Sequence, residues 1–591
     1  MNILVPLAFA AAIFFVALRL YPRYIARVFA ENERNTPPCV LFADDRDYVH
    51  SRTHVVFAHH FAAIAGAGPI VGPTLALAFG WQPVWLWIVI GGIFFGAVHD
   101  MSVLFTSVRE GGRTIGEIAR RTLGPAGYLL NLFVLIFVLT IVNAIFLNLS
   151  VTALTSIYPL TALGLAPDQQ MLGTVVEDGV TKARIGGIAT TSVFIITAVA
   201  PFLGYLIRHD RITTFRAYIV AAIVCVASVV AGFFWPITFS GETWRWVMSG
   251  YVFVACAIPV WLMLQPRDLI NVQILYGGMG LLFLSAIIAG LSGLTLQAPA
   301  LEVSAGQELV RGAIWPILFI TVACGAISGF HSLVASGTTV KQIPRETVVR
   351  GVGYGGMILE SFLALLVLTA VASMLPRAEY LSIVYPASAP SNPVLAFALA
   401  SGRLMNAALP FIPVAIAVVL GILMIEGFVV TTLDTAVRLC RYLIEEFWAF
   451  AFQGQAPAVL RHPWVNTAFA VGLMLFFALS STVRQMWPVF GAGNQLIGAL
   501  ALTTVSVWLV QRGRTYRYAL VPAAFMIVTT LAALVILIRN NLATAEGNLV
   551  LGVTASVLLV LSVGVVGVGT ARFAQALSLP PRPMPATATG K

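Results

Sequence analysis

The chain has 591 residues, of which 59% are hydrophobic and only 10% are charged. Its mean hydropathy is +0.92. A soluble protein of this length needs far more charged surface, so the composition excludes a soluble globular protein and indicates a membrane protein with many spans. The net charge of +10 does not indicate a nucleic-acid partner, because loops facing the cytoplasm account for it. The five cysteines are isolated, which argues against a disulfide framework and a thiolate metal site.

About fifteen apolar runs are long enough to cross a bilayer. In chain order they cover residues 2–20, 55–80, 83–108, 126–157, 187–207, 215–239, 246–264, 271–292, 312–337, 353–376, 408–432, 463–481, 490–510, 519–538 and 548–570. We expect a further short helix within 392–404. The sequence contains no G-x-x-x-x-G-K-[ST] motif, so ATP is not expected to drive this protein directly.

Basic residues predict the orientation of these spans. If the N-terminus lies outside, 26 of the 34 lysines and arginines fall in loops that face the cytoplasm, and 8 fall in the opposite loops. Cytoplasmic loops of membrane proteins carry this excess of positive charge. The sequence therefore predicts a multi-pass protein with its N-terminus outside and its C-terminus in the cytoplasm.

The second span is interrupted in its middle. It contains HHFAAIAGAGPIVGP (59–73), in which two histidines precede a run of glycines and prolines. In hydrocarbon, backbone that leaves the helix is tolerated only where it is packed in protein or lines a cavity. A span broken by glycine and proline is therefore the best pointer in a single sequence to a transport site.

A repeat is predicted within the spans that follow. Ten consecutive spans run from 55 to about 432, and the first five begin on the side opposite to the second five. The sixth, within 251–270, contains IPVWLMLQP (258–266), so each half would open with an interrupted helix. The predicted fold is an all-α polytopic membrane protein. It has a five-plus-five inverted-repeat transporter core with broken first and sixth core helices, one N-terminal accessory helix and about four C-terminal ones.

The predicted domains follow from this order. Residues 1–54 form an accessory helix and a cytoplasmic loop, 55–432 the transport core, 433–571 the C-terminal accessory helices, and 572–591 a disordered proline-rich tail.

Several ionisable residues fall inside spans, where their cost makes each a functional hypothesis. They are His59, His60, His99, Asp100, His331, Glu360 and Glu426. At a rise of about 1.5 Å per residue, most lie roughly 8–12 Å from the cytoplasmic side. The shared depth predicts a polar cavity or a proton relay, with His60, Asp100, His331, Glu360 and Glu426 as the coupling residues. Structural alternatives are a histidine that bonds a carbonyl near a helix end and a glutamate that pairs with arginine.

Metal binding is a weaker alternative for the same residues. The candidate zinc ligands are His59, His60, Asp100 and His331. Adjacent residues on a helix point about 100° apart, so His59 and His60 diverge, and no H-E-x-x-H spacing is present. No cofactor is expected.

A polar strip follows Cys324. Ser328, Ser332 and Ser336 recur at every fourth position and share a helix face with Gly325 and Gly329. One interpretation is close helix packing through small residues. The other is a hydroxyl face that opposes the unwound backbone of 66–69 and binds a ligand or a cation.

Five motifs of this chain are similar to those of a known family. They are HHFAAIAGAGPIVGP (59–73), QPRDLIN (265–271), CGAISGFHSLVASGTTVKQ (324–342), TTLDTAVRLCRY (431–442) and FGAGNQLIGALAL (490–502). On these motifs, from about residue 40 to about 510, the chain resembles the carbon starvation protein A family. These are bacterial inner-membrane carriers associated with peptides and pyruvate, related in fold to the amino acid–polyamine–organocation superfamily.

The resemblance implies where substrate would bind. Gly66, Ala67, Gly68 and Pro69 would line the site, with 258–266, including Pro259, as the second broken segment and Ser328 and Ser332 facing both. Arg267 and Asp268 would lie at the inner mouth. One departure is His99, which stands where the family is associated with glutamine.

The sequence-based expectation is a secondary active symporter of a bacterial inner membrane. It would import small carboxylates such as pyruvate, or short peptides, because the helix N-terminus after Gly68 suits a carboxylate. Protons are the expected coupling ion, with sodium as the alternative. The other function classes are a membrane nutrient sensor without transport and an intramembrane metal-dependent protein. Membrane lipid is the other expected partner, and the sequence does not indicate an oligomeric state.

Overall fold

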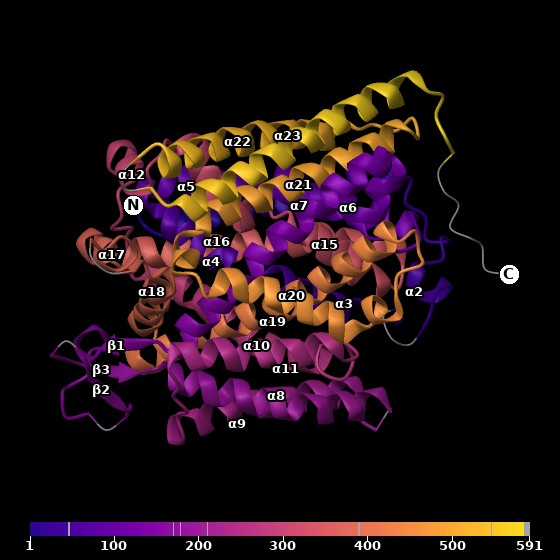
Figure 1. Ribbon diagram of the computed structural model, residues 1–591. Coiled ribbons are helices and arrows are strands. Elements are labelled where there is room, and N and C mark those ends of the chain that lie inside the picture. The colour runs from indigo at the N-terminus through magenta and orange to yellow at the C-terminus, as the bar shows by residue number, and fades with distance from the viewer. Residues whose placement is uncertain are drawn as a thin grey trace.

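A computed structural model describes residues 1–44, 48–169, 171–177, 179–209, 211–387, 390–544 and 547–583. Most helices lie along one common axis. The N-terminus and β1–β3 are at one end of this axis, and α2 and the end of α23 are at the other (Figure 1). Within the described residues, eleven helices are long and apolar enough to cross a membrane, or up to twelve if one bent pair forms a single span. The protein is an all-α multi-pass membrane protein with little sheet.

The elements of the first half are as follows. They are α1 (Leu4–Val28), α2 (Pro38–Leu41), α3 (Thr53–Ile64), α4 (Gly68–Ala76), η1 (Leu77–Phe79), α5 (Trp81–Gly91), η2 (Gly92–Gly96), α6 (Ala97–Arg109), α7 (Ile115–Leu154), β1 (Ile157–Pro159), η3 (Leu160–Leu163), β2 (Thr174–Glu177), β3 (Val180–Arg184), α8 (Gly186–Arg208), α9 (Thr214–Phe234), α10 (Gly241–Ala257) and α11 (Leu264–Leu291).

The second half contains the remaining elements. They are α12 (Val303–Val310), η4 (Ile314–Leu318), α13 (Phe319–Thr321), α14 (Ala323–Ala326), α15 (Phe330–Gly337), η5 (Thr339–Lys341), η6 (Glu346–Val348), η7 (Arg350–Gly355), α16 (Gly356–Met374), α17 (Arg377–Val384), α18 (Pro393–Ala408), α19 (Val414–Ala451), η8 (Ala458–Arg461), α20 (Pro463–Ala478), η9 (Ser481–Gln485), α21 (Trp487–Val510), α22 (Arg517–Leu542) and α23 (Leu549–Ser578).

Every predicted apolar run overlaps a helix or a series of helices, and α18 confirms the short helix expected within 392–404. Besides the second run, whose break is described below, three runs fall short of a single long helix. α10 and α20 have 17 and 16 residues, and the run 312–337 is divided into η4, α13, α14 and α15. Hydropathy gives the length of an apolar stretch but not its backbone conformation, so it cannot detect such a division.

The predicted break in the second span is confirmed. α3 ends at Ile64, α4 begins at Gly68, and the two are bent by 42°. Ala65 has the non-helical angles φ −75° and ψ 63°. Pro69 has no N–H to continue the helical hydrogen bonds and fits the first turn of α4.

The break predicted at 258–266 is instead a hairpin turn. The Arg267 guanidinium donates to the Tyr251 hydroxyl at 2.7 Å, although 16 residues separate the two. On one continuous helix they would lie about 24 Å apart, so the chain reverses between α10 and α11. Pro259 stops the helix because the residue before a proline is pushed out of the helical region, and Ile258 is extended with ψ 164°.

The second interrupted span lies within 314–337. Val322 (φ −98°, ψ 49°) and Ile327 (φ −161°, ψ 127°) leave the helical region on either side of α14. The backbone N–H of Val49, just before α3, donates to the carbonyl of Lys341, just after α15. The end of the second interrupted span thus lies beside the start of the first, and the two run antiparallel.

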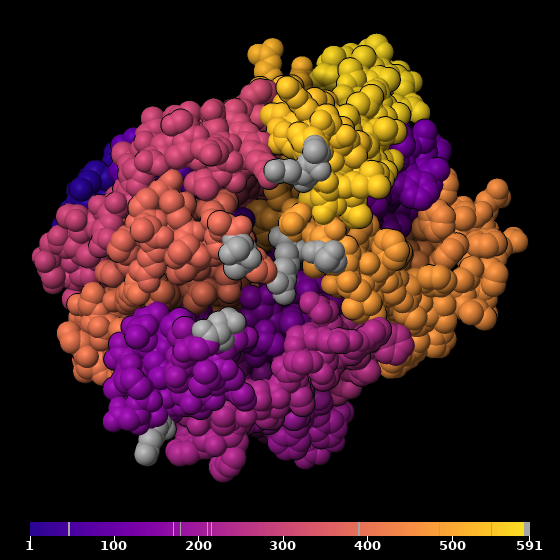
Figure 2. Space-filling view, turned by 60° about the vertical axis from the view of Figure 1, so that its left-hand side comes forward, coloured from indigo at the N-terminus to yellow at the C-terminus, as the bar shows by residue number. Residues whose placement is uncertain are grey.

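The loop 158–186 contains a small antiparallel sheet of order β1-β3-β2. Ile157 pairs with Arg184 on one side of β3, and Thr174 pairs with Ala183 on the other. The sheet lies at the end of the molecule opposite α2 (Figure 1). Seen from this end, segments of both halves of the chain surround a hollowed surface (Figure 2).

Two predicted domain boundaries cut through helices. α19 continues across the boundary at 432/433 to Ala451, and α23 continues across 571/572 to Ser578. The tail is therefore helical at its start, and its last residues, 584–591, lie outside the described residues.

The predicted orientation can be tested with exposed cysteines. Native Cys39 is unsuitable, because it is wholly buried and its thiol donates to the Ile343 carbonyl at 3.1 Å. Burial also raises the pKa of this thiol to about 11, which leaves little reactive thiolate. Val40 beside it is 51% exposed, and Val176 at the opposite end is 69% exposed.

We expect an impermeant maleimide to label Val176→Cys in intact cells and Val40→Cys only in inside-out vesicles. The parent chain is the control, since its five cysteines are all buried. Rapid labelling of Val40→Cys in intact cells would show that the predicted orientation is wrong.

Candidate functional site

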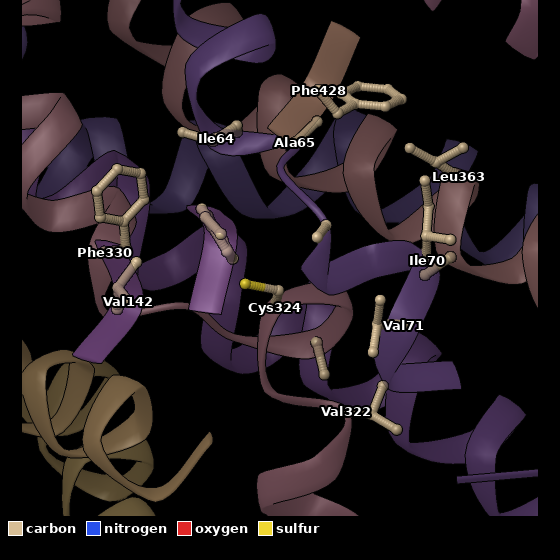
Figure 3. Close-up of a cluster of buried hydrophobic side chains, with 14 of the residues drawn as sticks. Ile64, Ala65, Ile70, Val71, Val142, Val322, Cys324, Phe330, Leu363 and Phe428 are labelled. Carbon is tan, nitrogen blue, oxygen red and sulfur yellow. The ribbon is translucent and has the colours of Figure 1, made fainter. Parts of the chain in front are cut away.

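The two interrupted spans cross in direct contact. A Cβ atom placed on Gly68 would lie 2.0 Å from Cβ and 2.3 Å from Sγ of Cys324. One turn further along α4, a Cβ on Gly72 would lie 2.8 Å from the carbonyl oxygen of Thr321 and 3.3 Å from Cα of Val322. Figure 3 shows Cys324 at this crossing, with Val71 and Val322 side by side next to it. Glycine is needed at 68 because the Cys324 side chain packs on the backbone there, and at 72 because the backbones of the two spans touch.

Helix α19 covers the other side of the first break. The Thr432 hydroxyl donates to the carbonyl of Ala63 at 3.4 Å, and a Cβ on Gly66 would lie 2.9 Å from the same hydroxyl oxygen. The neighbouring Thr431 hydroxyl accepts from the Asn271 amide of α11 at 3.3 Å. A carbonyl freed by the end of α3 thus has a hydroxyl partner inside the protein, as an unwound span requires.

Residues 66–69, predicted to bind substrate, are all buried at this crossing. The two predicted serines have other partners. The Ser332 hydroxyl donates to the carbonyl of Gly329, three residues earlier, at 2.6 Å. The Ser328 hydroxyl contacts Asn494 of α21. Pro259 lies in the hairpin turn described above, between α10 and α11.

Three of the predicted coupling residues form one buried network. His331 Nδ1 lies 2.7 Å from Asp100 Oδ2, and His331 Nε2 lies 3.1 Å from Glu360 Oε2. The other Asp100 oxygen lies 2.7 Å from Nδ1 of His99. All four side chains are 0% exposed. The network joins α6, α15 and α16, and His331 is the second residue of the helix that follows the second break.

The five residues predicted to share one depth do not form one cluster. His60 Nδ1 lies 2.9 Å from the Thr339 hydroxyl, and its ring packs on Gly356, one turn before Glu360 on α16. Glu426 lies elsewhere, where it accepts from the Ser150 hydroxyl at 2.7 Å. It lines a small cavity between α8, α11 and α19.

The candidate metal ligands are divided among different partners. His59 Nδ1 lies 3.3 Å from Asp268 Oδ2, His60 meets Thr339, and only His331 and Asp100 meet each other. In the part of the chain that the structure describes, no group of three or more His, Cys, Asp or Glu side chains is placed to hold a metal ion.

Sequence reasoning missed a second buried ion pair. Arg267 of α11 donates to Asp434 of α19, and the Tyr251 hydroxyl donates to the same carboxylate at 2.7 Å. Asp434 is part of the motif TTLDTAVRLCRY, but its likeness to family motifs gave no indication of its partner. Asn494 was missed in the same way, within FGAGNQLIGALAL.

A profile of the family described as "Carbon starvation protein CstA" matches residues 2–392 and 385–533. The chain belongs to this family. The match covers both interrupted spans, the His331 network and α21, so these features lie within the part shared with the CstA family.

Curated relatives include the pyruvate/proton symporter BtsT of Escherichia coli, which is 28% identical over 89% of this chain and 80% of its own length. The peptide transporter CstA of the same organism is 30% identical, over 89% and 79% respectively. The peptide transporter CstA of Bacillus subtilis is 28% identical over the whole of both chains. These names support a transporter.

Solved structures similar to this chain include a manganese transporter mutant of Eremococcus coleocola. It is 11% identical, covers 90% of this chain and 99% of its own, and has a TM-score of 0.43.

The contact at the crossing predicts a paired mutational effect. Gly68→Ala forces a methyl group into Cys324, and such overpacking costs about 1–3 kcal/mol. We expect substrate uptake to be lost with membrane insertion retained. Cys324→Gly in the same chain removes the two nearest atoms, and the next nearest is Cys324 Cα at 3.5 Å, so uptake should recover in part.

The matched control is Gly280→Ala in α11, where nothing lies within 4 Å of the added atom. Gly290 of the same helix would not serve as a control, because a Cβ there would lie 2.4 Å from Leu4 Cγ. Uptake by Gly68→Ala equal to that of Gly280→Ala would show that close contact at this crossing is not required.

Proposed function

We propose that this CstA-family protein is a secondary active transporter that imports small carboxylates such as pyruvate, or short peptides, coupled to proton entry. The observation that carries the proposal is the His331 network beside the two crossed breaks. One end of the network is fixed on α6 and α16, and the other lies on α15, which follows the second break directly. Protonation there can thus bias the conformation of the unwound segment.

The charges of the network explain why it would exchange a proton. An imidazolium at His331 compensates one carboxylate charge, but two carboxylates, Asp100 and Glu360, face it. An uncompensated charge away from water is costly, so one further proton would make the closed network neutral. A closed state would then favour the loaded network, and opening toward water would favour release.

The substrate class follows from the first break and from the relatives. Helix α4 begins inside the protein at Gly68, and the N–H groups of a helix N-terminus favour a carboxylate. The named relatives transport pyruvate in one case and peptides in the others, at nearly the same identity. Both substrates carry a carboxylate, and both belong to the proposal.

The finer assignments are proposals of the same kind. We propose that the protein lies in the inner membrane of a bacterium with the end that carries α2 in the cytoplasm, and the basic loops at that end support this orientation. We propose no catalytic activity and no cofactor. Sodium is the alternative coupling ion, and a non-transporting sensor or a zinc-dependent membrane protein is the alternative function.

Reconstitution separates these possibilities. Purified protein in proteoliposomes is tested for uptake of labelled pyruvate and of a labelled dipeptide under an imposed proton gradient, sodium gradient or neither. Accumulation of either substrate driven only by the proton gradient supports the proposal. Binding without accumulation would favour a sensor, and accumulation driven only by sodium would contradict proton coupling.

Asp100→Asn should abolish accumulation driven by the proton gradient, because it removes a charge that His331 and the exchanged proton require. Exchange of substrate across the membrane without a gradient should continue. The control is Glu302→Gln, which neutralises a partly exposed carboxylate paired with Arg377, outside the network. Concentrative uptake by Asp100→Asn at the level of Glu302→Gln would remove Asp100 from the coupling mechanism.

A further inference from the structure

The second interrupted span leaves backbone groups without helical hydrogen-bond partners. Helix α21 supplies partners for several of these groups. The Gln495 amide donates to the carbonyl of Phe319 at 2.8 Å. The Trp487 indole donates to the carbonyl of Thr321 at 3.2 Å. A Cβ on Gly491 would lie 2.0 Å from the carbonyl oxygen of Ile320, so the two backbones touch there. A helix predicted to be accessory therefore stabilises the unwound conformation of a core span.

Asn494 makes the densest set of these contacts. Its backbone carbonyl accepts from the N–H of Gly329 at 3.1 Å, and its side-chain Oδ1 accepts from the N–H of Phe330 at 2.9 Å. Its Nδ2 donates to the Ser328 hydroxyl at 3.1 Å and lies 3.5 Å from the Cys324 sulfur. The side chain is wholly buried. One carboxamide thus bridges both ends of the gap between α14 and α15.

These contacts place Asn494 at the N-terminus of α15. This helix begins at Phe330, and its cap residue, Gly329, has no side chain that could accept from the first N–H groups. A side-chain oxygen that accepts from such an N–H stabilises the helix start, as an N-cap residue does. Here the acceptor comes from another helix, and the first turn that it fixes contains His331.

We propose that Asn494 is a positioning residue for proton coupling: it holds the start of α15 so that His331 lies between Asp100 and Glu360. This inference rests on the proposed function, and it makes α21 part of the transport unit.

The groups that face His331 define what a displacement would change. They are Asp100, with His99 beyond it on α6, Glu360 on α16 and His60 on α3, and Cys324 lies at the start of the same break. Helices α7 and α19 also pack on α15. Among described residues, only Asp100 and Glu360 have charged groups at ion-pair distance from His331.

A matched pair of variants separates positioning from simple packing. Asn494→Leu and Gln495→Met each replace a buried carboxamide of α21 by an apolar side chain of similar size. Only the first removes the acceptor at Phe330, whereas the second removes the donor to Phe319. Asn494→Ala is the second test variant, in case Leu does not fit. Each protein is checked for a monodisperse elution profile and reconstituted.

Two measurements are made on each protein. The first is the pH dependence of uptake driven by a proton gradient. We expect Asn494→Leu to move the midpoint to higher pH by roughly half a unit or more, because the carboxylate that takes the further proton loses its cationic neighbour when the imidazolium is displaced. Gln495→Met should lower the rate without moving the midpoint. The second is the modification rate of Cys324 by N-ethylmaleimide, followed by mass spectrometry, which should rise in the Asn494 variants but not in Gln495→Met.

The outcomes distinguish this inference from the proposed function. If the parent protein transports but Asn494→Leu and Asn494→Ala keep its pH midpoint, Asn494 does not position the network and the inference is wrong. If the parent protein shows no proton-driven uptake, the proposed function fails, and with it the coupling role. The Cys324 rate then still decides whether Asn494 holds the break, and a rate equal to that of Gln495→Met would overturn this as well.

Discussion

An unwound stretch of a membrane span exposes peptide groups that hydrocarbon cannot hydrate, and each such group needs a partner from the protein. Two such stretches of the described chain lie after Ile64 and between Val322 and Gly329, and much of the surrounding structure supplies their partners. The Thr432 hydroxyl bonds the carbonyl of Ala63, and side chains of α21 bond carbonyls of the second stretch. Close contact of Gly68 with the Cys324 side chain and of Gly72 with the backbone of Thr321 leaves no room for lipid at the crossing.

Buried charged side chains also need partners inside the protein. A single charged side chain at the centre of a membrane helix raises the free energy of insertion by about 2.5–3.5 kcal/mol. Such side chains are therefore usually paired with others. His331 has carboxylates on both sides, and Arg267 is paired with Asp434. Each set joins helices that are distant in sequence. The first set adjoins an interrupted span, and this position distinguishes it from an ion pair that only holds two continuous helices together.

The sequence could predict the first break because glycines and prolines, which interrupt a helix, cluster in the middle of an apolar run. The second break was placed wrongly. The prolines around Pro259 mark a turn whose residues are as apolar as a span, so composition does not separate the two. The true second break has no proline and is held open by partners from α21, and a single sequence does not show which distant residues will meet.

The sequence predicted a common depth for the candidate site residues but could not predict their lateral positions. Counting residues from span ends gives depth, and Asp100, His331 and Glu360 do meet. Glu426 shares the predicted depth but lies near Ser150 and Arg267, because the arrangement of helices around one another is set by tertiary packing. Asn494 carried no ionisable group, so the search for costly charges inside spans could not find it.

The place of α21 in the chain has a consequence for biogenesis. Ser328 and Asn494 are 166 residues apart in the sequence, so a ribosome synthesises the second interrupted span long before the helix that satisfies it. Until α21 is inserted, the peptide groups near Val322 and Gly329 have their best partners within their own segment. We therefore expect the span to enter the membrane as a more regular helix and to unwind when the later helix docks. On this expectation the candidate site is completed late in assembly, by a helix that hydropathy alone places outside it.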